Sequence, residues 1–213
     1  MSGDPAAVAA VLWDADGVLQ RVPEGSEESM RPALEGRVAD VDGFLEQAYR
    51  AELPALTGHV SWLDVLPGLL AEWGIADAYD DVLRIWLTIE PIAATHDLVS
   101  ALRRSGVRCY LATNQAEHRG RYMRDDLGYL DLFDGAFYSH EMRVAKPDPE
   151  YFRVIVDTLG IAPGQALFLD DRLDNVESAR SVGMRAEMWS YREDLAVLRD
   201  HLHRHGVPVP LGT

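Results

Sequence analysis

Short apolar runs recur along the chain, and amphipathic stretches separate them. The first run, Val8–Asp14, is rich in Val and Ala and has no polar residue before its last position. A continuous apolar run of this length is typical of a strand buried on both faces of a parallel sheet. Similar runs, each predicted to be a strand, occur at Val107–Thr113, Gly135–Ser139, Ala166–Asp171 and Arg185–Trp189.

The stretches between these runs have apolar residues at helical spacing. His96–Gly106, Pro147–Gly160 and Leu173–Gly183 all close on glycine, and the second opens on proline, which is the usual asymmetry of helix ends. Strands that alternate with helices predict an α/β fold with a doubly wound, mainly parallel sheet. The Pro-rich end of the chain, Gly206–Thr213, predicts a frayed tail.

One long segment, Val22–Glu90, interrupts this alternation and contains no convincing strand. Apolar residues at helical spacing predict three helices, at Val41–Leu53, Ser61–Gly74 and Ala78–Glu90. The plainest account is a helical subdomain inserted after the first strand. We therefore expect a core made of residues 1–19 and 91–213 and an insertion at residues 20–90. The tryptophans of the insertion are expected to pack inside it, and they are Trp62, Trp73 and Trp86.

The charge of the chain narrows its range of partners. Its 213 residues include 35 acidic and 20 basic side chains, a formal net charge of −15, which repels phosphate backbones and argues against nucleic acid. No apolar run approaches the roughly 18 residues of a membrane span, and the first residues lack the pattern of a signal peptide. The single cysteine, Cys109, lies in apolar company. We therefore predict a cytoplasmic protein without disulfides or a membrane partner.

Polar residues gather where the predicted strands end. Parallel strands present their carboxyl ends at one rim of the sheet, where ligands bind. The residues in question are Asp14 and Asp16, Thr113 and Asn114, Lys146, and Asp170 and Asp171. A buried cluster of acids is costly unless a cation neutralises it, so we predict a divalent cation with oxygen ligands, such as Mg²⁺.

These side chains together predict a phosphoryl-transfer site. Asp14 is the candidate nucleophile toward phosphorus, and Asp16 is the candidate proton donor and acceptor. The Thr113 hydroxyl and the Asn114 backbone N–H are candidates for holding phosphoryl oxygens. Lys146 would supply positive charge to the transition state.

Four motifs in this order resemble those of the haloacid dehalogenase-like hydrolase superfamily. They are DADGV (Asp14–Val18), LATN (Leu111–Asn114), AKPDPEYF (Ala145–Phe152) and FLDDRLDNVESARSVGM (Phe168–Met184). The helical insertion is similar to that of the subclass with a C1-type helical cap. The resemblance implies a Rossmann-like core, a cap that closes over the site, and Mg²⁺-dependent phosphoryl transfer through an aspartyl-phosphate.

The resemblance also implies a role for each matching residue. Asp14 matches the nucleophile and a metal ligand, and Asp16 matches the general acid/base, whose backbone carbonyl is the second ligand. Thr113 matches the phosphate-binding hydroxyl, and Lys146 matches the charge-stabilising lysine. Asp171 matches the metal-binding acid of the fourth motif.

The fourth motif departs from the usual pattern. Asp170 precedes the matching acid and shares the metal prediction, whereas Asn175 stands where many relatives carry a further acid. This variant resembles the branch that contains sugar-phosphate phosphatases and the phosphatase domain of soluble epoxide hydrolase. Dehalogenases of the superfamily lack an acid at the position of Asp16. We therefore expect a small phosphorylated metabolite, with a sugar phosphate as one option, rather than a 2-haloacid.

Two alternatives to a phosphatase stay open at this point. Mutases of the β-phosphoglucomutase type share the four motifs, although residues 20–30 lack the histidine of their cap signature. A non-catalytic binding protein that kept the fold is the second alternative. Gln20 and Arg21, just beyond the catalytic loop, are predicted substrate contacts, with a linker role equally open. The protein is expected to be a monomer or a homodimer.

Other charged residues on predicted helices are expected to face solvent. For the histidines among them a transition-metal site is the alternative. The residues are Arg119, Arg121, Arg124, His201, His203 and His205.

Overall fold

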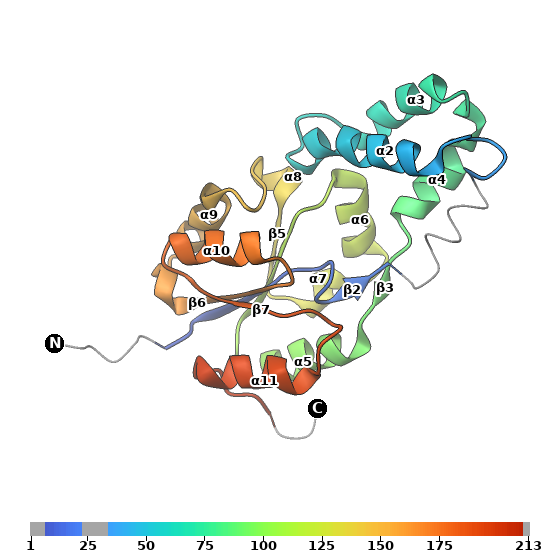
Figure 1. Cartoon of the computed structure of the whole chain (residues 1–213). Coiled ribbons are helices and arrows are strands. Elements are labelled where there is room, and N and C mark those ends of the chain that lie inside the picture. The colour runs from blue at the N-terminus through green and yellow to red at the C-terminus, as the bar shows by residue number, and fades with distance from the viewer. Residues whose placement is uncertain (1–6, 23–33, 211–213) are drawn as a thin grey trace.

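The computed structural model describes residues 7–22 and 34–210. Its centre is a five-stranded sheet with the order β5-β4-β1-β6-β7, in which every neighbouring pair is parallel. The strands are β1 (Ala10–Trp13), β4 (Cys109–Thr113), β5 (Ala136–Tyr138), β6 (Ala166–Asp170) and β7 (Arg185–Met188). The five predicted strands and their parallel arrangement are therefore confirmed (Figure 1).

Helices cover both faces of this sheet, which makes the fold doubly wound. One face packs against α5 (Ala93–Arg104) and α11 (Leu195–Arg204), and the other packs against α9 (Pro149–Leu159) and α10 (Leu173–Ser181). The remaining helices of this part are α6 (Glu117–Asp125), α7 (Tyr129–Leu132) and α8 (Ser139–Met142). Within the described residues, no helix combines the length and apolarity needed to cross a bilayer.

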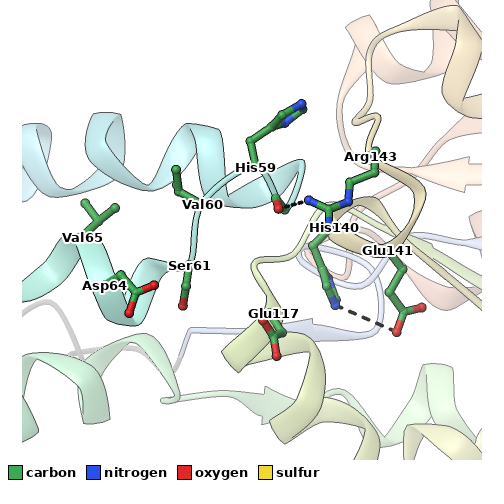
Figure 2. Close-up of a pocket in the computed structure, with 10 residues that line it drawn as sticks. His59, Val60, Ser61, Asp64, Val65, Glu117, His140, Glu141 and Arg143 are labelled. Atoms are coloured by element: carbon green, nitrogen blue, oxygen red, sulfur yellow. Dashed lines mark hydrogen bonds and ion pairs between the residues drawn. The ribbon is translucent and has the colours of Figure 1, made fainter.

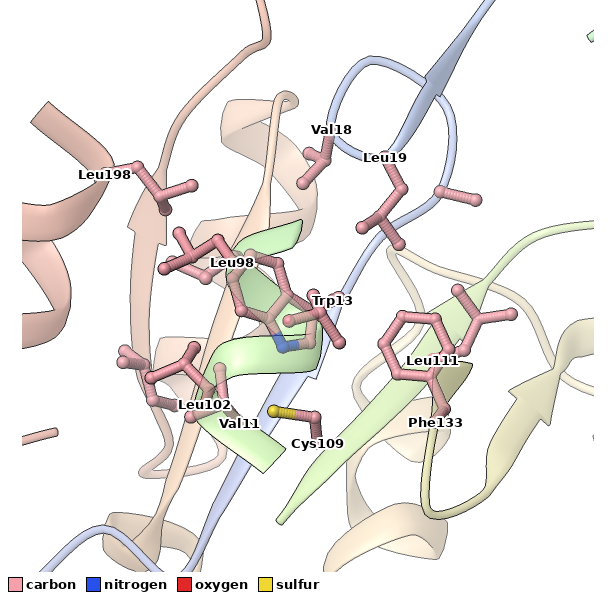
Figure 3. Packing of buried hydrophobic residues seen from close by; sticks show 14 of the residues in the cluster. Val11, Trp13, Val18, Leu19, Leu98, Leu102, Cys109, Leu111, Phe133 and Leu198 are labelled. Carbon is pink, nitrogen blue, oxygen red and sulfur yellow. The ribbon is translucent and has the colours of Figure 1, made fainter. Parts of the chain in front are cut away.

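The continuous apolar character of β1 follows from this double burial. Val11 and Trp13 point into the cluster under α5 and α11, whereas Leu12 points into the cluster under α9 and α10. All three are fully buried, because successive strand residues alternate between the two faces. Figure 3 shows Cys109 beside Val11 in the first cluster. Burial raises the pKa of the Cys109 thiol to about 12, which suits a packing residue.

The inserted helices form a hydrophobic cluster of their own. They are α2 (Val41–Leu56), α3 (Trp62–Glu72), the short η1 (Ala76–Ala78) and α4 (Tyr79–Trp86), and we refer to them as the cap. The rings of Trp62 and Trp86 stack at 5.2 Å inside it, and Trp73 meets Phe44 edge-on at 5.6 Å. The three tryptophans therefore pack as predicted. We keep the predicted division of the chain into core and cap as a proposal, which this separate cluster supports.

Two short features differ from the sequence-based expectations. A two-residue ladder joins β2 (Gln20–Arg21) to β3 (Glu90–Pro91) where the chain enters and leaves the cap, and so short a ladder has no detectable periodicity. The prediction of a frayed tail is wrong as far as residue 210, because Val207 and Val209 are buried in the hydrophobic cluster under α5 and α11. Residues 211–213 lie outside the described part of the chain.

Candidate active site

The carboxyl ends of the three central strands meet beneath the cap. β1 leads to Asp14, β4 ends at Thr113 and β6 ends at Asp170. The strand order reverses direction at β1, and this is the place where doubly wound sheets bind ligands. A cavity of about 560 Å³ opens here, and we call it the active-site cavity. Its lining comprises Asp14, Asp16, Gly17, Leu53, Leu56, Thr113, Asn114, Ala145, Lys146, Pro147, Asp171, Arg172 and Asn175.

Lys146 lies between two carboxylates at the floor of this cavity. Its Nζ is 2.7 Å from Asp14 Oδ1 and 2.7 Å from Asp170 Oδ2. The side chains of all three residues are almost completely buried. Lys146 is the only lysine among the 20 lysines and arginines of the chain. A compact ammonium group fits between two closely spaced carboxylates, whereas the planar guanidinium of arginine is larger.

Neighbouring groups hold both ends of this arrangement. The Asn114 amide accepts from the Lys146 backbone N–H at 2.9 Å and donates to the Lys146 carbonyl at 2.8 Å. Asp170 accepts from the Asn175 side chain at 3.0 Å and from the Arg172 backbone N–H at 2.8 Å. Asn114 and Asn175 therefore position the lysine and its partner carboxylate.

Three carboxylates lie close enough to hold a metal ion. Oxygen atoms of Asp14, Asp170 and Asp171 are within 4.8 Å of one another. Burial raises the pKa of Asp14 to about 8 against the opposing charge of Lys146, and burial with the charge of Asp170 raises the pKa of Asp171. One ammonium group does not balance three carboxylates. An all-oxygen donor set with excess negative charge fits a hard divalent cation such as Mg²⁺.

Gly17 allows Asp171 to approach the first motif. A Cβ atom on Gly17 would lie 2.1 Å from Asp171 Oδ2, and the φ angle of Gly17 is +82°, a value that residues with a side chain rarely adopt. Both observations require glycine here. Asp171 itself lines the active-site cavity.

Four hydrogen bonds hold the Asp16 carboxylate. Arg119 donates to both oxygens, at 2.6 and 2.9 Å. Gln115 donates to Oδ2 at 2.7 Å, and Gln20 donates to Oδ1 at 2.9 Å. Burial alone would raise the pKa of Asp16, but the Arg119 guanidinium and these hydrogen bonds outweigh burial and lower it to about 2. Asp16 is therefore a carboxylate in this arrangement.

Arg119 is the residue that sequence reasoning missed. It was expected to face solvent, but its side chain is only 14% exposed, and it also donates to the Trp86 carbonyl of the cap at 3.1 Å. The expectation is therefore wrong for Arg119, whereas it holds for Arg121, which is 65% exposed. Arg119 is one of several arginines on a predicted helix, and nothing in the neighbouring sequence indicates that its side chain is buried. Its 103-residue separation from Asp16 hides the pairing from the sequence.

The predicted substrate contacts fall into two groups. Thr113 and Asn114 line the active-site cavity. Gln20 and Arg21 are not among the residues that line it: Gln20 is buried and bonded to Asp16 and Tyr129, and Arg21 pairs with Glu90 at 2.9 Å. Contact of these four residues with substrate stays a prediction.

A second hollow, of about 700 Å³, lies where the cap meets α8. Figure 2 shows Arg143 reaching the turn between α2 and α3, where it donates to the Gly58 carbonyl. A Cβ on Gly58 would lie 2.4 Å from the His140 carbonyl oxygen, so glycine permits close contact of cap and core. This hollow contains none of the strand-end residues.

The late histidines are arranged differently from a metal site. His201 and His205 lie 3.4 and 2.8 Å from the carboxylate of Glu187 on β7, while His203 is exposed. Among the described residues, the cluster of acids at the strand ends is the one group of possible ligands close enough to hold a metal.

Comparison with known proteins identifies the family. The family model described as haloacid dehalogenase-like hydrolase matches residues 8–183. The chain belongs to this family. It is 32% identical to the phosphoglycolate phosphatase of Rhodospirillum rubrum over 208 residues, which cover 89% of this chain and 83% of that protein. With the phosphorylated carbohydrates phosphatase of Thermotoga maritima it shares 25% identity over 187 residues, 82% of each chain.

Other similarities are shorter or concern the fold alone. The chain is 32% identical to the sesquiterpene phosphatase astK of Aspergillus oryzae over 96 residues, about half the length of each protein. Enzyme BT-2542 of the same family from Bacteroides thetaiotaomicron, solved with magnesium and inorganic phosphate, has a TM-score of 0.75 at 21% identity, covering 90% of this chain and 99% of that one. The L-2-haloacid dehalogenase of Xanthobacter autotrophicus reaches 0.63 at 20% identity, covering 90% and 81%. Enzyme BT-2542 and the dehalogenase thus share the fold of this chain.

Proposed function

We propose that this hydrolase is a Mg²⁺-dependent phosphatase of small phosphate monoesters that reacts through an aspartyl-phosphate on Asp14. The observation that carries the proposal is the convergence of Asp14, Lys146, Asp170 and Asp171 at the strand ends, where all but the fully buried Asp170 line the active-site cavity. Phosphatases among the relatives support the same chemistry. The presence of Asp16 separates this site from that expected of a dehalogenase.

The first half-reaction transfers the phosphoryl group to the protein. An oxygen of Asp14 forms a bond to phosphorus while the bond from phosphorus to the ester oxygen breaks. Asp16 gives a proton to the departing alcohol oxygen. Lys146 holds Asp14 in place and offsets charge that develops on the phosphoryl oxygens. Thr113, which lines the cavity, is the proposed hydroxyl donor to one of those oxygens.

The second half-reaction releases phosphate. Water attacks the phosphorus, the bond to Asp14 breaks, and Asp16 accepts the proton that the water loses. The overall balance is one ester and one water giving one alcohol and one inorganic phosphate. Hydrogen bonds from Arg119 keep Asp16 in the carboxylate form that accepts this proton. To act as the donor in the first half, Asp16 must turn away from Arg119 while it still carries the proton that it took from water in the preceding turnover.

Residues of the strand ends would hold the metal ion. Asp14 and Asp171 are its proposed side-chain ligands together with the Asp16 backbone carbonyl, and Asp170 has its oxygens engaged by Lys146, Asn175 and a backbone N–H. Bound Mg²⁺ would supply positive charge to the phosphoryl oxygens. The buried single cysteine supports the proposed location in the cytoplasm. We keep the small phosphorylated metabolite, and a monomer or homodimer, as the proposed substrate and assembly.

Release of inorganic phosphate from p-nitrophenyl phosphate tests the proposal, measured with Mg²⁺ and after its removal with EDTA. We expect Mg²⁺-dependent turnover that Asp14→Asn lowers by a factor of about 10⁴ or more. Asp157→Asn is the matched control, because Asp157 is exposed on α9 and outside the cavity. Full activity in Asp14→Asn, or no release from any ester in a broad panel, would overturn the proposal.

A further inference from the structure

The two sides of the active-site cavity differ in chemistry. The core supplies the charged and hydrogen-bonding side chains at the strand ends, whereas the described cap residues that line the cavity are Leu53 and Leu56. Both belong to α2. A phosphate held at the strand ends therefore directs its organic group toward two leucine side chains.

Leu53 is not part of the packing that holds the cap together. The face of α2 that packs inside the cap carries Phe44, Ala48 and Ala55, and Leu53 lies about 200° around the helix from Ala55. Its residue is 59% exposed, and it is absent from the hydrophobic cluster of the cap. An isolated exposed leucine is ordinary on a protein surface. This one borders the catalytic cavity, where a bound group would cover it.

We propose that the substrate is the phosphate monoester of an apolar alcohol, with an alkyl, prenyl or aryl group lying against Leu53 and Leu56. This inference rests on the proposed phosphatase function and narrows its substrate class. Leucine side chains neither donate nor accept hydrogen bonds. The hydroxyls of a sugar would lose water against them without gaining partners, whereas an apolar group gains from the area that it removes from water.

Two further polar residues of the core, Arg172 and Asn175, line the cavity and make hydrogen bonds within the protein. The Arg172 guanidinium pairs with Asp174 through two hydrogen bonds of 3.1 and 2.7 Å. Asn175 donates to Asp170 through its amide nitrogen, while its buried Oδ1 has no hydrogen-bond partner among the described residues. Hydrogen-bonding capacity in the described lining is thus concentrated where the phosphate binds, and the cap side selects by apolar contact.

A homologous series of alkyl phosphates tests the inference. We would measure kcat/KM for ethyl, butyl and hexyl phosphate, with glucose 6-phosphate and p-nitrophenyl phosphate beside them. We expect kcat/KM to rise about three- to fourfold for each added methylene until the cavity is filled. Hexyl phosphate should be a better substrate than glucose 6-phosphate by at least about tenfold.

Leu53→Ser tests whether the dependence of kcat/KM on chain length comes from contact with Leu53. The variant should lose about tenfold in kcat/KM for hexyl phosphate while ethyl phosphate changes little, and Leu53→Met should restore the wild-type slope. Leu130→Ser is the matched control, because Leu130 is 69% exposed on α7 and outside the cavity.

Three results would each contradict the inference. If kcat/KM does not change with chain length, or if glucose 6-phosphate is the better substrate, the apolar substrate class is wrong while the phosphatase function stands. If Leu53→Ser leaves the slope unchanged, Leu53 does not contact the leaving group. If no ester is hydrolysed, p-nitrophenyl phosphate included, the proposed function fails and the inference with it.

Discussion

The active-site cavity has a core wall, formed by the strand-end residues, and a cap wall, formed by Leu53 and Leu56. The two walls differ in burial and in polarity. On the core wall, Asp14 and Lys146 are at most 6% exposed, and Lys146 lies 2.7 Å from Asp14 and 2.7 Å from Asp170, which is fully buried and does not line the cavity. On the cap wall, Leu53 is 59% exposed and makes no hydrogen bond through its side chain. Phosphoryl transfer needs charges that are fixed before the substrate arrives. Selection of an organic group needs only a surface of suitable polarity, and such a surface tolerates change.

The strongest test of this contrast removes the charge at the centre of the core wall. Lys146→Met leaves Asp14 and Asp170 buried side by side without a counter-charge, so we expect the free energy of unfolding to fall by about 3 to 5 kcal/mol. Phosphatase activity should fall at least a hundredfold. Urea unfolding and a p-nitrophenyl phosphate assay measure the two effects.

Two further variants test whether the shape and the buried position of the Lys146 charge matter. Lys146→Arg keeps the charge but not the shape, and we expect it to recover little activity because the guanidinium is too large for the gap. Arg153→Met removes an exposed cation that pairs with Glu150, and its stability should stay within about 0.5 kcal/mol of wild type. Equal stability of Lys146→Met and Arg153→Met would contradict the central role of Lys146.

A substitution that leaves a cavity inside the cap should lower the free energy of unfolding without lowering the catalytic rate. Leu66 is fully buried in the hydrophobic cluster of the cap, and Leu66→Ala should cost about 2 to 4 kcal/mol. Because Leu66 does not line the active-site cavity, turnover of p-nitrophenyl phosphate should stay within about threefold of wild type where the variant is folded. A loss of kcat as large as that of Lys146→Met would show that the two walls are not independent.

Arg119 joins Asp16 of the core to Trp86 of the cap, and its removal has a defined pH dependence. In the folded protein the pKa of Asp16 is about 2, below its ordinary value of 3.8. The stabilisation is therefore complete above pH 3.8 and is lost as the pH falls through 2. Arg119→Met should cost about 1 to 2 kcal/mol at neutral pH, since Asp16 is partly exposed.

Thermal or urea unfolding of wild type and Arg119→Met across this pH range measures the effect. The difference in stability between the two proteins should shrink as the medium becomes acidic. Arg121→Met, which removes a neighbouring exposed cation, should show no such convergence. A constant difference at all pH values would mean that Arg119 acts through packing rather than through the Asp16 carboxylate.

The smallest expected effect concerns His118, beside Arg119 on α6. Burial, with the charges of Arg119 and His140, lowers the pKa of His118 from 6.5 to about 4, and neither ring nitrogen has a hydrogen-bond partner among the described residues. Its neutral form therefore stabilises the fold above pH 6.5, and this contribution is lost as the pH falls toward 4.

His118→Phe should reduce the drop in melting temperature between pH 7 and pH 5 by about 2 °C or more. Circular dichroism at the two pH values measures the change, with the exposed His203 changed in the same way as the control. An unaltered drop would mean that the pKa of His118 is the same in the folded and the unfolded protein.

Much of the fold could be predicted because burial leaves a local pattern. Val8–Asp14 is apolar throughout since β1 is covered on both faces, and alternation with helices then implies parallel strands. Parallel order places Asp14, Thr113 and Asp170 at one rim, so the strand-end residues could be predicted together. The β2–β3 ladder and the buried tail could not, because two residues show no period and a Pro-rich end resembles a disordered one.

The sequence by itself determined which groups gather on the core wall: the candidate nucleophile Asp14, one lysine, and the acids that surround it. Tertiary structure alone decided what those groups touch. It brings Arg119 into contact with Asp16, 103 positions away in the chain. Gln20 is bonded to Asp16 and does not line the cavity. Leu53 lies on the cap wall of the cavity. The physical reason is that strand burial is encoded by neighbouring residues, whereas a single helix side chain is buried or exposed according to what packs over it.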